Sequence, residues 1–330
     1  MRERILTFRQ GFSRLMRNKP AQRVFYIIVI FVSLGFIAYA TYVNWNELKA
    51  HKWELDYKYI ALSVILFPVG MLPAVAAWHK LLDALGVKLS YWRNLRIYAI
   101  SSLPRHIPGL VWYASSRAML YKENGVAAGL ILAATAAEIF LHAVTGFIMS
   151  ILLLVRSAAA LERYSALRFI IPVALIIILG LIFSPPVFNR VLPGLLKRWH
   201  LEQVPAIQRN SLIACLLWLV PAWSGGGFLL FLLVRGMYPI QWSYLPVMIG
   251  IWSLASAIGL TVGIGVSGMG LREVSLGALL SLVVPPITAV VAAIAFRLVL
   301  TVGEFIWVML FVWIIKSVPQ YDEGRKEDSS

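Results

Sequence analysis

The sequence is poor in cysteine and in charged residues. Cys215 is the only cysteine among 330 residues, which excludes disulfides within the chain and leaves no cysteine cluster for a metal. Charged residues make up 14% and apolar residues 60%, whereas soluble domains are roughly half apolar and a quarter charged. This composition excludes a soluble globular protein and indicates that lipid surrounds most of the chain.

The motifs of common hydrolases are also missing. The chain contains no Gly-x-Ser-x-Gly, no His-Glu-x-x-His and no cluster of carboxylates that would suit a catalytic metal. We therefore expect no catalytic residues, no metal and no cofactor.

Apolar runs long enough to cross a bilayer recur along the chain. A helix needs about 20 apolar residues to cross a hydrocarbon core of about 30 Å, and lipid leaves an open segment no other way to satisfy its backbone. We expect spans at Val24–Val43, Tyr59–Leu82, Val126–Val155, Phe169–Phe183, Leu212–Val234, Tyr244–Gly263 and Ile287–Ile315.

Polar ends flank this apolar part. The head, residues 1–23, has seven Lys and Arg residues against Glu3 alone, which places the N-terminus in the cytoplasm by the positive-inside rule. Apolar residues at helical spacing between these arginines predict a helix lying on an anionic leaflet, with a disordered basic tail as the alternative. The transmembrane part covers 24–315, and a short polar tail covers 316–330. The net charge of +15 thus reflects topology in large part, and we expect no nucleic acid partner.

Two apolar stretches are interrupted. Leu95–Tyr121 is split by Pro104-Arg105-His106-Ile107-Pro108-Gly109, and Gly263–Val284 opens with glycines at 263, 265, 268 and 270. Each arm of the first stretch is about a dozen residues, or about 18 Å, which reaches mid-membrane and back. We predict an all-α polytopic membrane protein of about seven to eight transmembrane helices with two interrupted or re-entrant hairpins, which need a cavity or protein around them.

Ionisable residues inside spans rarely persist without a partner or a task, because each costs about 2.5–3.5 kcal/mol on insertion scales. Glu138 and His142 lie one helical turn apart in one span, and Arg297 and Glu304 share a face of the last span. One hypothesis is that Glu138 and Arg297 line a polar cavity, with His142 and Glu304 as second partners. The alternative is a buried ion pair that fixes helix packing, and a proton-coupled role for Glu138 or His142 is a third.

Both breaks resemble anion-binding sites. Pro104 ends one arm, and Pro108 and Gly109 begin the next, whose free N–H groups lie beside Arg105 and His106. Arg117, farther along this arm, is predicted either to reach a cytoplasmic headgroup or to snorkel to the surface.

Glycines make the second break a candidate anion-binding site as well. Gly268 and Gly270 let the backbone approach a ligand closely, and we expect a helix from Leu271 with Arg272 and Glu273 in its first turn. The pattern Gly263-x-Gly265-x-x-Gly268 also fits the dinucleotide fingerprint, but a membrane span lacks the strand–turn–helix context, so we reject nucleotide binding.

Two of these segments carry a family resemblance. Leu103-Pro-Arg-His-Ile-Pro-Gly-Leu-Val-Trp112 with Arg117, and Gly268-Met-Gly-Leu-Arg-Glu273, resemble the two signature regions of the lysylphosphatidylglycerol synthase transmembrane, or flippase-like, family. The resemblance covers essentially the whole chain, and Glu138 and Arg297 lie where that family has polar residues. It implies helices around two re-entrant hairpins in a bacterial-type plasma membrane. It also implies a candidate headgroup site formed by Arg105, Pro108, Gly109, Arg117, Glu138, Gly270, Arg272, Glu273 and Arg297.

The resemblance implies translocation of a lipid with a charged or glycosylated phosphate headgroup. Aminoacylated phosphatidylglycerol and a polyprenyl-phosphate-linked sugar are the candidate substrates. Full-length synthases add a soluble aminoacyltransferase domain, and this chain ends about fifteen residues after its last predicted span, so we expect no synthase activity. The rival hypotheses are an intramembrane enzyme acting on a lipid phosphate, with Glu138 or Glu273 as base, and a non-transporting scaffold for proteins of envelope lipid or glycan synthesis.

Overall fold

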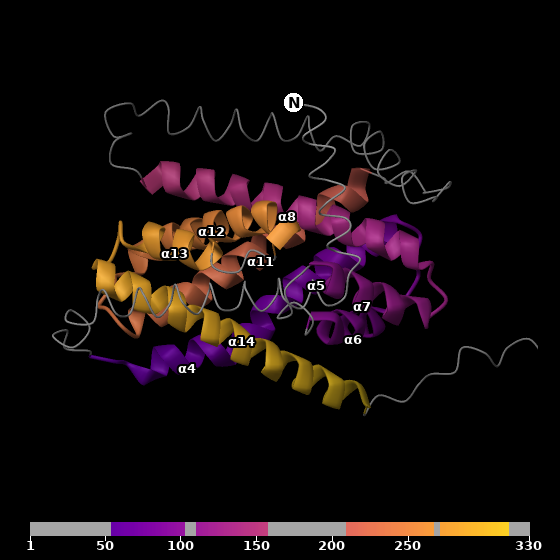
Figure 1. Ribbon diagram of the computed structural model, residues 1–330, viewed down its shortest axis with the longest axis horizontal. Coiled ribbons are helices and arrows are strands. Elements are labelled where there is room, and N and C mark those ends of the chain that lie inside the picture. Colours follow the sequence, from indigo (N-terminus) through magenta and orange to yellow (C-terminus); the bar gives the residue numbers. More distant parts are fainter. Residues whose placement is uncertain (1–53, 103–109, 158–208, 267–270, 317–330) are drawn as a thin grey trace, which may run out of the picture.

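The chain is helical wherever its structure is described. The computed structural model describes residues 54–102, 110–157, 209–266 and 271–316, and these residues form helices and their connections without any strand (Figure 1). Five helical segments of this part are long and apolar enough to cross a membrane. The prediction of an all-α polytopic membrane protein is confirmed.

These five segments coincide with five predicted spans to within a few residues. The helices that form them are α4 (Tyr57–Ile65) with α5 (Phe67–Ala84), α8 (Ala128–Ser157), α11 (Arg209–Arg235), the 3-10 turn η3 (Trp242–Tyr244) with α12 (Leu245–Val266), and α14 (Pro286–Lys316). The spans predicted at Val24–Val43 and Phe169–Phe183 lie outside the described residues, as do the basic head and the C-terminal tail.

The first interrupted stretch forms two short antiparallel helices, α6 (Tyr91–Ser102) and α7 (Leu110–Lys122). The Tyr121 hydroxyl donates to Asn94 Oδ1 at 2.7 Å, so the end of α7 lies beside the start of α6. Helices of 12 and 13 residues are about 18–20 Å long, less than the hydrocarbon thickness of about 30 Å. The break, 103–109, lies outside the described residues, and the first arm begins at Tyr91 rather than at Leu95.

The second interrupted stretch differs from the prediction at its start. Helix α12 continues through Gly263 and Gly265 to Val266, whereas the break was expected to open at Gly263. Glycine does not end a membrane helix by itself, because lipid offers the backbone no other hydrogen-bond partner. Helix α13 (Leu271–Leu280) begins where it was expected.

Helix α11 packs against α4, α5, α8, α12 and α14. Three consecutive glycines let its neighbours approach closely. A β-carbon on Gly225 would lie 3.3 Å from Gly70 Cα of α5, and one on Gly227 would lie 2.3 Å from Ile249 Cα of α12. Such small-residue contacts are typical of packed membrane helices.

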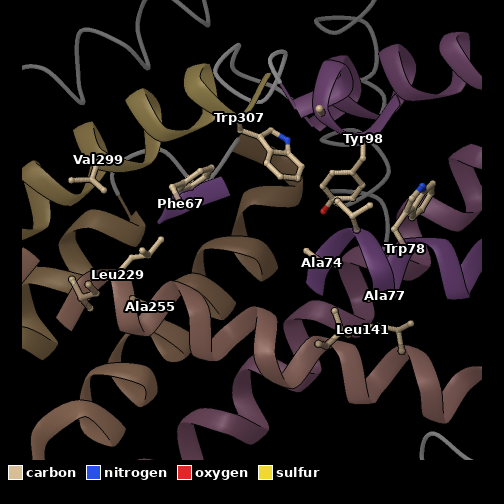
Figure 2. Close-up of a cluster of buried hydrophobic side chains, with 14 of the residues drawn as sticks. Phe67, Ala74, Ala77, Trp78, Tyr98, Leu141, Leu229, Ala255, Val299 and Trp307 are labelled. Atoms are coloured by element: carbon tan, nitrogen blue, oxygen red, sulfur yellow. The ribbon is translucent and has the colours of Figure 1, made fainter. Parts of the chain in front are cut away.

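A cluster of buried side chains joins the first helices to the last one. Phe67 and Trp78 from α5, Tyr98 from α6 and Trp307 from α14 belong to this cluster (Figure 2). The short helix α6 packs against α14, α7 and α5. It also carries residues that surround a buried charge.

Candidate functional site

A fully buried ion pair connects α7 to α8. Arg117 Nη1 lies 2.5 Å from Glu138 Oε2, and the two side chains are 0% and 6% exposed. Burying one charge without its partner costs several kcal/mol, so each of these residues depends on the other. We call Arg117 and Glu138 the buried pair.

Three aromatic rings enclose the guanidinium of Arg117. Its Cζ lies 4.2 Å from the ring centre of Trp78 and 4.4 Å from those of Tyr98 and Tyr113. A desolvated cation–π contact contributes about 2 kcal/mol or more. Arg117 Nε also donates to Ser101 Oγ at 3.2 Å. The buried pair therefore lies where α5, α6, α7 and α8 meet.

This position contradicts the surface role predicted for Arg117. A residue that reaches a cytoplasmic headgroup or snorkels to the surface would be exposed, whereas Arg117 is completely buried. Counted along α8, Glu138 is ten residues from Ala128, or about 15 Å from the start of this helix.

A cluster of three charged side chains joins α13 to α14. Arg297 Nη1 donates to Glu273 Oε1 at 2.8 Å, and Arg272 Nη2 lies 3.3 Å from the same oxygen. The arginine side chains are 31% and 34% exposed and that of Glu273 is 11% exposed. We call Arg272, Glu273 and Arg297 the arginine cluster. Its two positive charges share one carboxylate, which leaves one positive charge in excess.

The arginine cluster lies away from the ends of α14. Arg297 is eleven residues from Pro286, the start of α14, which corresponds to about 16 Å along the helix. The guanidinium of Arg272 lies 5.7 Å from the ring centre of Trp252 on α12, and Gly259 of α12 leaves room for the Arg272 side chain. Two guanidinium groups are thus brought together at the start of α13, directly after the second break.

Glu138 and Arg297 do not form an ion pair with each other. Each has a different partner, because α7 supplies Arg117 to Glu138 and α13 supplies Glu273 to Arg297. His142 lies at the backbone of Glu138, with Nδ1 3.1 Å from the Glu138 carbonyl oxygen. Glu304 is buried in α14.

Glu138 and His142 face a narrow crevice between α5, α8 and α11. Its other walls are mainly apolar and include Trp78, Leu141 and Cys215. The crevice has no room for a water molecule, so the buried pair is closed off on this side. His142 packs edge-on against Trp223, whose Nε1 donates to Thr145 Oγ1 at 3.0 Å.

Sequence reasoning missed the surroundings of Arg117. Trp78, Tyr98 and Tyr113 carry no motif, and only the packing of α5, α6 and α7 brings their rings together. Tyr91, at the start of α6, contacts the ring of His79, and partial burial raises the pKa of its phenol.

The remaining predicted headgroup residues lie outside the described residues. They are Arg105, His106, Pro108 and Gly109 of the first break and Gly268 and Gly270 of the second. Within the described ranges, no group of three or more His, Cys, Asp and Glu side chains is placed to hold a metal ion.

The family comparison matches most of the chain. The family model described as lysylphosphatidylglycerol synthase TM region matches residues 26–307. The chain belongs to this family. The matched region contains both the buried pair and the arginine cluster, and it confirms the resemblance seen in the two signature segments. A comparison with curated proteins found no match. Membership in the lysylphosphatidylglycerol synthase TM family indicates a multi-pass membrane protein with a lipid-related function.

Proposed function

We propose that this protein carries a lipid with an anionic phosphate headgroup across a bacterial-type plasma membrane. The arginine cluster is the site that holds the phosphate. The observation that carries the proposal is the pair of partly exposed guanidinium groups, Arg272 and Arg297, which share the single carboxylate of Glu273. Guanidinium groups bind phosphate by two parallel hydrogen bonds, and the excess positive charge favours an anion.

The contrast with the buried pair assigns the two centres different roles. Arg117 is paired with Glu138 and is fully buried, so it has no surface to offer a ligand in this conformation. The arginine cluster has excess positive charge and partly exposed side chains. We therefore assign Arg117 and Glu138 to holding α7 against α8, and Arg272 and Arg297 to ligand contact.

Depth supports translocation over surface binding. A headgroup that crosses the membrane must meet polar partners near the midplane, and Arg297 lies about 16 Å along α14, whose helical residues start at Pro286. Discontinuous helices at such a depth are typical of transporter sites. We propose that α6 and α7 form a re-entrant hairpin and that Arg105, His106, Pro108 and Gly109 at its tip, with Gly268 and Gly270 before α13, complete the headgroup path.

The charges at the helix ends give the orientation. The end of α5, the start of α6 and the end of α7 lie together and carry exposed Lys80, Lys88, Arg93 and Lys122. By the positive-inside rule we assign this end, and the N-terminus, to the cytoplasm.

The substrate class follows from phosphate recognition. Aminoacylated phosphatidylglycerol and a polyprenyl-phosphate-linked sugar both present a phosphate beside a bulky polar group, and both remain candidates. We propose a transporter and not an enzyme or a scaffold, because the site offers two cations for holding an anion.

Reconstitution into vesicles tests the proposal. Fluorescent phosphatidylglycerol is placed in both leaflets, and a membrane-impermeant quencher reports the fraction that becomes accessible. We expect the protein to raise the rate of exchange and the double variant Arg272→Gln, Arg297→Gln to lower it at least tenfold, since charge-assisted hydrogen bonds contribute about 1.5–3 kcal/mol each.

The matched control is Arg93→Gln, which removes an exposed arginine far from the cluster and should leave the exchange rate unchanged. Exchange by the double variant at the parent rate would remove the cluster from the mechanism. Conversion of the lipid to a new product would favour the enzyme, and binding without exchange would favour the scaffold.

A further inference from the structure

A chain of hydrogen bonds connects the wall of the Arg117 site to the edge of the bundle. The Trp78 Nε1 donates to the Tyr121 hydroxyl at 2.8 Å, and that hydroxyl donates to Asn94 Oδ1 at 2.7 Å. Asn94 Nδ2 lies 2.7 Å from His79 Nδ1. His79 Nε2 faces the carboxylate of Asp83 at 3.6 Å. We call this chain the histidine relay.

The direction of the relay is fixed by groups that have only one role. An indole N–H can only donate, so the Tyr121 oxygen accepts from Trp78, and in this structure its hydroxyl donates to Asn94 Oδ1. Asn94 Nδ2 also points at the Leu89 carbonyl, which can only accept, at 3.5 Å. The amide nitrogen therefore faces His79, and His79 Nδ1 must accept. His79 is then neutral, with its proton on Nε2 toward Asp83.

The two ends of the relay differ in exposure. Trp78, Asn94 and Tyr121 are fully buried, whereas the side chains of His79 and Asp83 are 18% and 39% exposed. Protons can therefore reach His79 but not the rest of the relay.

Several ionisable groups lie around His79. On α5, Asp83 faces it and is itself paired with Lys80 at 3.9 Å, and on α6 the phenol of Tyr91 contacts its ring. From α7, Tyr121 reaches it through Asn94. Helix α6, which packs on α5, also carries Arg93, Arg96 and Tyr98. Helices α8, α11 and α14 pack on α5 as well, and their described ionisable groups are Glu138, His142, Cys215, Arg235, Arg297 and Glu304.

We propose that His79 is a proton-operated switch that acts through the histidine relay on Trp78 and thereby on the enclosure of Arg117. A proton added at Nδ1 would place two donors 2.7 Å apart, so the Asn94 amide must turn over and present its oxygen to His79. Its nitrogen then faces Tyr121, which can no longer donate to Asn94 and must redirect its hydroxyl proton. The indole N–H of Trp78 then donates to a Tyr121 hydroxyl whose orientation has changed. The Trp78 ring lies 4.2 Å from the Arg117 guanidinium, so the change reaches the enclosure of Arg117.

This inference goes beyond lipid movement and does not depend on it. The relay joins residues of α5, α6 and α7 and none of the arginine cluster. Loss of lipid exchange would not test the switch, and failure of the switch would leave the proposed transport intact.

Nuclear magnetic resonance of the full chain in lipid nanodiscs tests the switch. With ¹⁵N-histidine, the His79 signals are identified by their loss in His79→Gln, and with 5-fluorotryptophan the Trp78 signal is identified by its loss in Trp78→Phe. If Trp78→Phe does not accumulate, that signal is identified by elimination with the other tryptophans. At pH 8 we expect the His79 proton on Nε2, and on lowering the pH to about 5.5 we expect Nδ1 to gain a proton and the Trp78 signal to shift.

Three variants separate the relay from a local effect. In Tyr121→Phe the link to Trp78 is cut, so His79 still titrates and the Trp78 signal stays fixed. In Asn94→Asp the carboxylate has no N–H to turn toward Tyr121, and neutral His79 must carry its proton on Nδ1 to donate to it, so the Trp78 signal again stays fixed in either state of His79. The control Tyr91→Phe removes a hydroxyl from a ring that touches His79 outside the relay, and the Trp78 response should persist.

Three results would overturn the proposal. The first is a His79 proton on Nδ1 at pH 8. The second is a Trp78 signal that ignores pH in the parent protein, and the third is a Trp78 response that survives Tyr121→Phe.

Discussion

At the scale of single residues, the identity of the charges was predictable and their pairing was not. Glu138 and Arg297 stand out in apolar segments, because ionisable residues are costly there. Which residue neutralises each one depends on which helices are neighbours, and this comes from tertiary packing. Arg117 lies in the second half of a short helix and was expected to reach a headgroup or snorkel to the surface, yet its side chain points inward to Glu138 and Ser101.

The buried pair should behave as one unit in unfolding experiments. Removing one partner of a buried ion pair costs roughly 3–5 kcal/mol, because the other charge remains buried, whereas replacing both by apolar residues is often nearly neutral. We expect Arg117→Met and Glu138→Leu each to lower the unfolding temperature in detergent strongly, and the double variant to lower it less than either single variant.

A surface substitution such as Arg93→Met serves as the control and should change the unfolding temperature little. Additive losses in the double variant would show that Arg117 and Glu138 do not depend on each other.

At the scale of helices, length and apolar composition predicted the spans well. Lipid leaves an apolar segment of about 20 residues no alternative to a helix, so Tyr59–Leu82 and Ile287–Ile315 agree closely with α4–α5 and α14. Helix α12 continues three residues past the predicted end at Gly263, because glycines that break a helix in water can continue one inside a bundle. The short arms α6 and α7 were predicted because prolines and a glycine interrupt an otherwise apolar stretch.

The close approach of α11 and α12 gives a prediction at this scale. In Gly227→Ala the new β-carbon would lie 2.3 Å from Ile249 Cα, a backbone atom that can move only if the helices separate. Overpacking of this kind costs about 1–3 kcal/mol or more, so the unfolding temperature should fall.

Gly277→Ala is the matched control, since its β-carbon would meet Ala293 at an ordinary 3.8 Å. Alanine also favours a helix by about 1 kcal/mol over glycine, so this variant should be as stable as the parent or more stable. Equal stability of both variants would contradict the packing of α11 on α12.

At the scale of the whole molecule, we assign a structural role to the buried pair and ligand contact to the arginine cluster. The buried pair is neutral as a whole and closed to solvent, while the arginine cluster has excess positive charge and partial exposure. Both join the second arm of an interrupted stretch to the helix that follows it, α7 to α8 and α13 to α14. The glycine-rich break pointed to Arg272 and Glu273, the apolar span pointed to Arg297, and the family resemblance implied one site containing all three, but not the ion pair between Arg297 and Glu273.

The central claim is that Arg272 and Arg297 hold a lipid phosphate, and native mass spectrometry of the purified protein tests it most directly. Retention of phosphatidylglycerol is compared with that of phosphatidylcholine in the parent protein, in the double variant Arg272→Gln, Arg297→Gln and in the control Arg93→Gln. We predict that the parent and the control retain phosphatidylglycerol preferentially, and that the double variant retains it about tenfold less well. Undiminished retention of phosphatidylglycerol by the double variant would contradict the account.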